Sequence, residues 1–193
     1  MSDPAPTSNG PARLLGLCGS LRRASSNLAI LHAAVELAPP DVEVVLHPLR
    51  DLPMFDADLE AVGTPAAVAD LIDAVQACDG LLLATPEYNW SITGALKNAI
   101  DWLSRGPEAP IDEVPAALLS GAGSSGGRRA LAHLRDVLGH NRVDVIDREV
   151  RIARATAHVR DGRLTTEEHR DAVAASVAEL AARVRERRAA AAA

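Results

Sequence analysis

The sequence predicts an α/β protein, a three-layer sandwich in which a five-stranded parallel sheet carries helices on both faces. Short apolar runs of four to seven residues alternate with helical patterns of ten or more along the whole chain, which is typical of repeated strand–helix–strand units. The run GLLLA at residues 80–84 is too uniformly apolar to have one face in water. A chain of 193 residues that is 48% hydrophobic can bury a core without disulfides or structural metal.

The first half of the chain contains two strand–helix pairs. RLLGLCG at 13–19 is a buried strand, and the helix at 27–38 ends before two prolines, Pro39 and Pro40. VEVVLH at 42–47 is the next strand. The helix at 65–78 follows, because its apolar residues recur at helical spacing.

The second half repeats the alternation three more times. The expected strands are 80–84, 116–120 and 143–146, and the expected helices are 94–104, 127–138 and a last one from Thr165 to about Arg187. The last helix opens on the capping-box pattern Thr-Thr-Glu-Glu. Five strands and five helices match the flavodoxin-like strand order 2-1-3-4-5 better than a six-stranded sheet, with right-handed crossovers.

Composition limits the class of protein. We expect one flavodoxin-like domain at 12–188, a flexible lead-in at 1–11 and a disordered alanine tail at 189–193. A net charge of −6 and the lack of a lysine-rich block argue against nucleic-acid and membrane partners. No signal peptide or membrane-spanning stretch is recognisable, so the expected location is cytoplasmic. Cys18 and Cys78 form neither a disulfide framework nor a zinc site, and no metal is expected.

In such sheets, ligands bind beyond the carboxyl ends of the strands, where the strand order reverses. The loop after the first strand reads GSLRRASSN and joins that strand to a helix. Its hydroxyls, its two arginines and the N–H groups of the helix start favour phosphate binding. The alternative is a solvated loop in which Ser26 or Asn27 is a plain N-cap.

The other two candidate loops also have unusual compositions. TPEYNWSITG follows the third strand and offers aromatic area and main-chain polar groups for a planar heterocycle. The alternatives are ordinary loop packing for Tyr88, and a place in the core or at an interface for Trp102. SGAGSSGG follows the fourth strand, and its four glycines allow a close approach of the backbone to a ligand, unless the loop is simply mobile.

These loops hold no set of residues for acid–base or nucleophilic catalysis. All six histidines lie outside them in the sequence, which argues against a Ser-His-Asp triad. The reactivity must therefore come from a bound cofactor.

Three motifs resemble those of the NAD(P)H-dependent FMN reductases, with the closest likeness to the chromate, azo or quinone reductase branch. They are Gly19-Ser20-Leu21-Arg22 with Ser25 and Asn27, Pro86-Glu87-Tyr88-Asn89, and Gly94 followed by Leu96-Lys97-Asn98-Ala99-Ile100-Asp101-Trp102. The likeness runs in order from about residue 13 to residue 180.

The resemblance implies a set of FMN contacts and no catalytic side chain. Ser20, Arg22, Ser25, Ser26 and Asn27 would hold the phosphate. Pro86, Glu87, Tyr88 and Asn89 would line the isoalloxazine ring, and Gly121, Ala122, Gly123 and Gly126 would contact its pyrimidine edge. The family usually has a proline where this chain has Thr93, so we expect a less rigid loop there. The resemblance also implies a homodimer, with a homotetramer as a further state.

Two functions with FMN compete. The first is an oxidoreductase that takes hydride from NADPH or NADH onto FMN and passes electrons to a small-molecule acceptor: a quinone, a flavin, an azo dye or a metal oxyanion. The second is a flavodoxin-like electron-transfer or redox-sensing protein without nicotinamide turnover. A flavin-free α/β interaction module would require three coincidental ligand loops.

Overall fold

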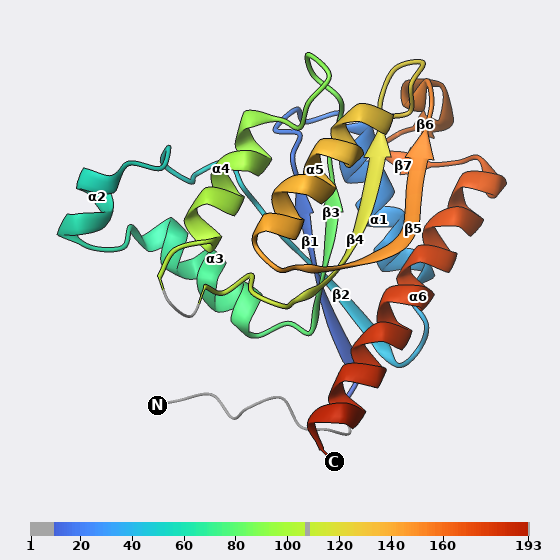
Figure 1. Cartoon of the computed structure of the whole chain (residues 1–193). Helices are drawn as coiled ribbons and strands as arrows, with labels where there is room; N and C mark the ends of the chain where they lie inside the picture. Colours follow the sequence, from blue (N-terminus) through green and yellow to red (C-terminus); the bar gives the residue numbers. More distant parts are fainter. Residues whose placement is uncertain (1–9, 107–108, 193) are drawn as a thin grey trace.

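The computed structural model describes residues 10–106 and 109–192. Its centre is a parallel sheet in the order β2-β1-β3-β4-β5, which confirms the predicted fold class (Figure 1). The strands are β1 (Ala12–Cys18), β2 (Val42–His47), β3 (Gly80–Ala84), β4 (Pro115–Gly121) and β5 (Asp144–Ile152).

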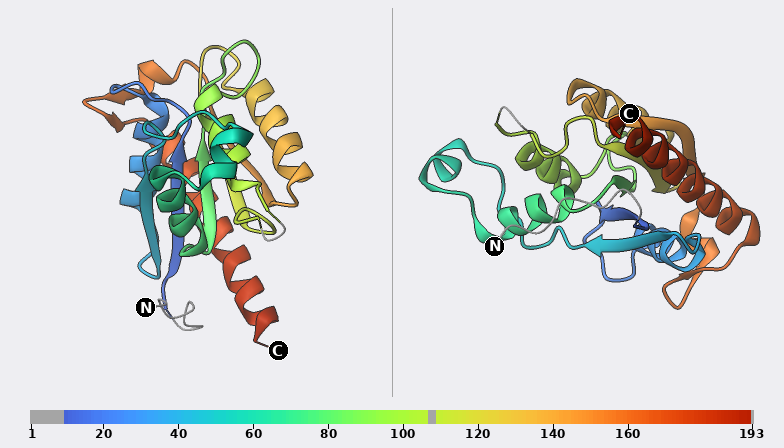
Figure 2. Two further views of the ribbon diagram at one scale, coloured as in Figure 1. Left: turned by 90° about the vertical axis from the view of Figure 1, so that its left-hand side faces the viewer. Right: turned by 90° about the horizontal axis from the view of Figure 1, so that it is seen from below.

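Helices cover both faces of this sheet and form a separate apolar core on each. One face packs against α1 (Ser26–Leu37) and α6 (Glu167–Ala191), and the other against α3 (Ala66–Gln76), α4 (Gly94–Leu103) and α5 (Arg128–His140) (Figure 2). β3 and β4 are buried along their whole length. Because helices shield both sides, these two strands carry only apolar or small residues, as parallel sheets require.

Three short elements escape the sequence pattern: the helix α2 (Ala57–Val62), the 3₁₀ helix η1 (Ala155–His158), and a two-stranded hairpin of β6 (Val159–Arg160) and β7 (Arg163–Leu164). β5 also runs six residues beyond its expected end at Ile146. As an edge strand, β5 can leave Asp147, Arg148 and Arg151 exposed to water. Because these residues are polar, the strand does not stand out in the sequence as an apolar run.

The last helix begins where the capping pattern predicts, but without the predicted cap. Thr166 is the N-cap residue of α6, and its side chain makes no capping bond. Its Oγ1 lies 2.8 Å from Nδ1 of His158 instead. His158 belongs to η1, an element that the sequence pattern does not predict.

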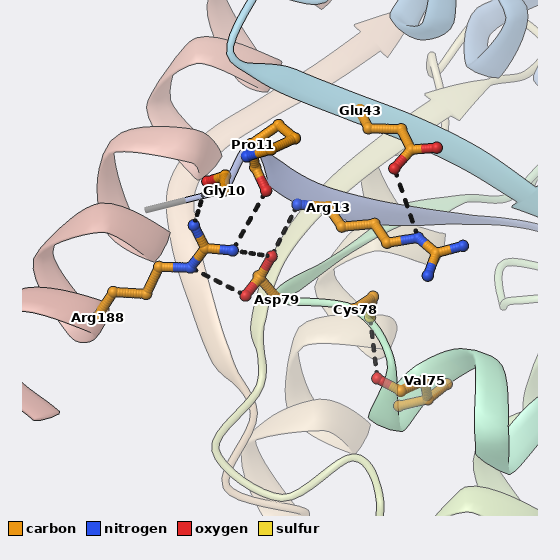
Figure 3. Close-up of polar contacts among 8 residues, drawn as sticks. All are labelled: Gly10, Pro11, Arg13, Glu43, Val75, Cys78, Asp79 and Arg188. Carbon is orange, nitrogen blue, oxygen red and sulfur yellow. Dashed lines mark hydrogen bonds and ion pairs between the residues drawn. The ribbon is translucent and has the colours of Figure 1, made fainter. Parts of the chain in front are cut away.

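The expected disordered tail at 189–193 is wrong for residues 189–191, which continue α6. Alanine has the highest helix propensity, and Arg188 anchors this end. Arg188 binds Asp79 at 2.7 Å and donates to the carbonyls of Gly10 and Pro11, while Asp79 also accepts from the N–H of Arg13 (Figure 3). Residues 10 and 11 of the expected lead-in are thus held in place; residues 1–9 lie outside the described part.

Cys78, in the same close-up, donates to the carbonyl of Val75, and burial raises the pKa of its thiol to about 12 (Figure 3). Such a thiol stays protonated and unreactive at neutral pH. Among the described residues, no helix is long and apolar enough to cross a membrane. The same residues contain no group of three potential metal ligands.

Candidate active site

Three loops meet at the carboxyl edge of the sheet, where the strand order reverses between β1 and β3. They are residues 19–25 after β1, 85–93 after β3, and 122–127 after β4 (Figure 1). β1, β3 and β4 are neighbours, so the fold brings together the three loops that the sequence singles out.

The first loop ends at an open helix N-terminus. Ser25 is the N-cap of α1 and accepts a hydrogen bond from the N–H of Leu28. Within the described chain, the N–H groups of Ser26 and Asn27 have no acceptor. Arg22 and Arg23 are exposed beside them. Two free N–H groups, nearby hydroxyls and guanidinium groups are the donors that a phosphate needs.

The other two helix N-termini at this edge are also capped by side chains. Thr93 caps α4 by accepting from the N–H of Leu96. The carboxylate of Glu87 caps α5 by accepting from the N–H groups of Arg129 at 2.9 Å and Ala130 at 3.2 Å. Glu87 places a carboxylate at the start of α5, whereas α1 and α4 are each capped by one hydroxyl. Of these two helices, α1 follows the loop that carries Arg22 and Arg23, which favours its start as the anion site.

The side chain of Asn27 is itself engaged within the protein. Its Nδ2 donates to the carbonyl of Gly121 and its Oδ1 accepts from the N–H of the same residue, both at 2.8 Å. The carboxamide thus joins α1 to the end of β4. Any contact of Asn27 with a phosphate must come from its main-chain N–H, and not from the side-chain donor that the sequence suggests.

The second loop is a tight reverse turn that projects from the edge. Tyr88 and Ser91 exchange main-chain hydrogen bonds across it, and Asn89 and Trp90 have φ of 49° and 65°. Two positive φ angles in succession are those of a type I′ turn. The turn leaves Tyr88 56% and Trp90 68% exposed, with the guanidinium of Arg129 3.8 Å from the Trp90 ring centroid.

Glu87 ties this loop to the third one. Besides capping α5, its carboxylate accepts from the hydroxyl of Ser125 at 2.9 Å. Burial raises the pKa of Glu87, but the hydrogen bonds from Ser125, Ala130 and Arg129 outweigh it, so the pKa lies below its usual value. The side chain therefore holds two loops together, while only the main chain of Glu87 remains to line a ligand.

Because the pKa of Glu87 is lower in the folded than in the unfolded protein, its ionised form stabilises the fold. This contribution is complete above the unfolded pKa of about 4.3 and is lost as the pH falls through the folded value. We expect Glu87→Gln to reduce stability at pH 7 by about 1 kcal/mol, the scale of a helix cap, and by less below pH 4. Urea unfolding of both proteins between pH 3 and pH 8 measures this difference; a difference independent of pH would contradict it.

The third loop needs its glycines mainly for contacts within the protein. Gly126 and Gly127 have φ of 61° and 82°, and a Cβ on Gly127 would lie 1.8 Å from Oγ of Ser120. A Cβ on Gly126 would meet Ala153 and Arg151 at 3.3–3.4 Å. A side chain at Gly126 would therefore crowd the end of β5 and the residue that follows it. At Gly123, by contrast, a Cβ would enter open space.

The expectation of a less rigid loop at Thr93, in place of the usual proline, is not met. The Oγ1 of Thr93 donates to the carbonyl of Gly19 at 2.7 Å while accepting from Leu96. One hydroxyl therefore caps α4 and ties the first loop to the second. Pro86 is buried, and the N–H of Ala122 donates to the carbonyl of Ile152.

The structure also gives the positions of His133 and Trp102, which the sequence alone does not reveal. His133, on α5, has its Nδ1 2.7 Å from Oγ of Ser91, so a histidine does border the second loop. Within the described chain it has no carboxylate partner, and no Ser-His-Asp triad forms. Trp102 is 2% exposed, donates to the carbonyl of Pro53 and packs edge-on against Phe55, which places it in the core of its own chain.

The donor set fits FMN. One open helix start can take one phosphate, and the adjoining turn offers main-chain groups and an exposed tyrosine to a planar ring. The hydrogen bonds of Asn27, Glu87 and Thr93 join the segments of this edge to one another. They do not use the N–H groups at the start of α1.

Comparisons with known proteins agree with this reading. A family model described as NADPH-dependent FMN reductase matches residues 12–157. An NAD(P)H-dependent FMN reductase of Pseudomonas aeruginosa is 42% identical over 83% of this chain and 89% of its own. A quinone reductase of Escherichia coli is 41% identical over 65% of this chain and 69% of its own.

Among solved structures, the flavoenzyme NAD(P)H:(acceptor) oxidoreductase FerB of Paracoccus denitrificans superposes with a TM-score of 0.78 and 30% identity. The match covers 91% of this chain and 98% of that one. The family model spans three quarters of the sequence and includes all three loops. The chain therefore belongs to the NADPH-dependent FMN reductase family of oxidoreductases, whose cofactor is FMN.

Proposed function

We propose that this enzyme uses NADPH or NADH to reduce FMN and passes the electrons to a quinone. The observation that carries the proposal is the start of α1, where two N–H groups without an acceptor in the described chain lie beside the exposed Arg22 and Arg23. The names of the relatives in Escherichia coli and Solanum tuberosum support a quinone as acceptor. Free flavins, azo dyes and metal oxyanions are the other acceptors to compare with it.

The residues of this chain would bind FMN and orient its ring. The N–H groups of Ser26 and Asn27, the hydroxyls of Ser20 and Ser25, and Arg22 would hold the phosphate. Pro86, Glu87, Tyr88 and Asn89 would line the ring, and Ala122, Gly123 and Gly126 would meet its pyrimidine edge. Gly121 is buried and both of its main-chain polar groups are bonded to Asn27, so it supports this edge from behind. Bound FMN supplies the hydride and electron chemistry, which needs no side-chain acid or base.

Binding of FMN and riboflavin tests the phosphate assignment directly. Riboflavin lacks the phosphate, so it loses several charge-assisted hydrogen bonds of ~1.5–3 kcal/mol each. We expect FMN to bind at least a hundredfold more tightly, measured by quenching of flavin fluorescence. Equal affinities, or release of mostly FAD from the denatured protein, would contradict the proposal.

We also propose a homodimer. α2 buries none of its six residues in the described chain, and Val62 at its end is 84% exposed (Figure 1). A six-residue helix is not stable by itself, and here the Arg105–Glu60 ion pair ties it to the residues that follow α4. A second copy would supply the missing contacts. Sedimentation equilibrium at micromolar concentration should show a dimer, and a flavin-bound monomer would overturn this proposal.

A further inference from the structure

The positive charges of this chain are unevenly distributed. Eleven of its nineteen arginines form ion pairs with carboxylates. In the described part of the chain, the other eight have no carboxylate within 4.0 Å, and all eight lie in or beside segments at the carboxyl edge of the sheet. The edge that carries the candidate site therefore holds the arginines that no carboxylate of the described residues neutralises.

The net charge of this edge opposes that of the protein. Segments 19–25, 85–93, 122–129 and 151–160 hold seven arginines and one glutamate, a net charge of +6. The rest of the chain holds 13 basic and 25 acidic residues, a net charge of −12. The one glutamate is Glu87, whose carboxylate is engaged with Ser125 and the start of α5. A local field of this sign attracts anions and raises their concentration at the site.

Three of these arginines border the third loop. The segment after β5 is bonded along that loop: the N–H of Arg154 donates to the carbonyl of Gly123 at 2.8 Å, and the N–H of Ala155 donates to that of Ala122 at 3.1 Å. A Cβ on Gly126 would lie 3.4 Å from Cβ of Arg151. Arg128 begins α5 directly after the same loop. The side chains of Arg128, Arg151 and Arg154 are all exposed.

The backbone of Arg154 is in an unusual conformation. Its φ is 49°, in the left-handed region, and the bonds from its N–H to Gly123 and from the N–H of Ala157 to its carbonyl hold it there. Non-glycine residues in this region carry strain and cluster at ligand sites. The conformation fixes an arginine next to a glycine loop whose own residues include no carboxylate, and the Glu87 carboxylate that reaches this loop is engaged with Ser125 and the start of α5.

We propose that Arg128, Arg151 and Arg154 form a second anion site that binds the phosphates of the nicotinamide dinucleotide and favours NADPH over NADH. This inference rests on the proposed function and is separate from the FMN phosphate site at α1. The diphosphate common to both dinucleotides carries a charge of about −2, and the 2′-phosphate of NADPH adds about −1.5 to −2 at pH 7. Three unpaired guanidinium groups therefore match NADPH better in charge.

Calorimetry on the FMN-loaded protein tests the proposal with the unreactive ligands NADP⁺ and NAD⁺. We expect NADP⁺ to bind at least tenfold more tightly than NAD⁺. Arg151→Ala and Arg154→Ala should each weaken NADP⁺ about tenfold, the loss of one charge-assisted contact, and NAD⁺ about threefold or less. Arg148→Ala is the matched control, because Arg148 lies on β5, is exposed and is paired with Glu179 at 2.7 Å.

A second measurement separates this inference from the proposed function. Adenosine 2′,5′-bisphosphate, added to the flavin-free protein, should bind the wild type and lose about tenfold in affinity in the Arg154→Ala variant, while the affinity of all variants for FMN stays unchanged. Equal binding of NADP⁺ and NAD⁺ by the wild type, or wild-type affinity for NADP⁺ in both arginine variants, would overturn the second site. If the wild-type protein does not bind FMN, the proposed function is contradicted. The bisphosphate measurement does not require flavin, so it still tests the arginines independently.

Discussion

Asn27→Ala should lower the free energy of unfolding of the flavin-free protein by about 3 kcal/mol. The substitution removes two buried hydrogen bonds and leaves both main-chain groups of Gly121 without their partner. Each unsatisfied buried group costs ~1–3 kcal/mol. Urea denaturation measures the loss, and the flavin affinity should fall as well, because α1 and the end of β4 are no longer joined.

Ser20→Ala is the matched control for this substitution. Ser20 lies on the same loop, is half-buried, and within the described chain its hydroxyl makes no hydrogen bond. We expect its stability without flavin to stay within about 0.5 kcal/mol of the wild type, while FMN binds about tenfold more weakly. Equal, small losses of stability in both variants would show that Asn27 does not join the two elements.

Gly127→Ala should be the most destabilising single methyl addition at this edge, with an expected loss of about 3–5 kcal/mol. The residue has φ of 82°, which costs a side chain ~1–2 kcal/mol. The added Cβ would also collide with Ser120, whose hydroxyl donates to the carbonyl of Thr85 at 2.6 Å. Displacing that buried bond costs a further ~1–3 kcal/mol.

Gly123→Ala tests whether the loss at Gly127 comes from this geometry. A Cβ on Gly123 meets no atom within 4 Å, and its φ is not positive. We expect a change within about 0.5 kcal/mol by thermal or urea unfolding. If the two alanine variants unfold alike, the third loop is not held as the structure shows.

The fold could be predicted from the sequence because its main signals are local. β3 is an uninterrupted apolar run, β4 consists of apolar and small residues, and α3 carries apolar residues at helical spacing. The short elements lack such signals. α2 has no buried residue and β5 is half polar, so neither leaves a periodic pattern to detect.

The roles of individual side chains depended on contacts that the sequence does not reveal. Asn27 meets Gly121 across 94 residues, Glu87 caps a helix 42 residues away, and His133 meets Ser91. The sequence pattern correctly located the loops that meet. It did not show which polar side chains hold those loops together and which groups stay open to a ligand.

The central claim is that this chain carries FMN and reduces it with a nicotinamide dinucleotide. The most direct measurement is the visible absorbance of the FMN-loaded protein under anaerobic conditions, after one equivalent of NADPH and then of a water-soluble quinone. The account predicts that NADPH bleaches the flavin band within seconds and that the quinone restores it. A flavin band that NADPH and NADH leave unchanged would contradict the account and favour an electron-transfer protein without nicotinamide turnover.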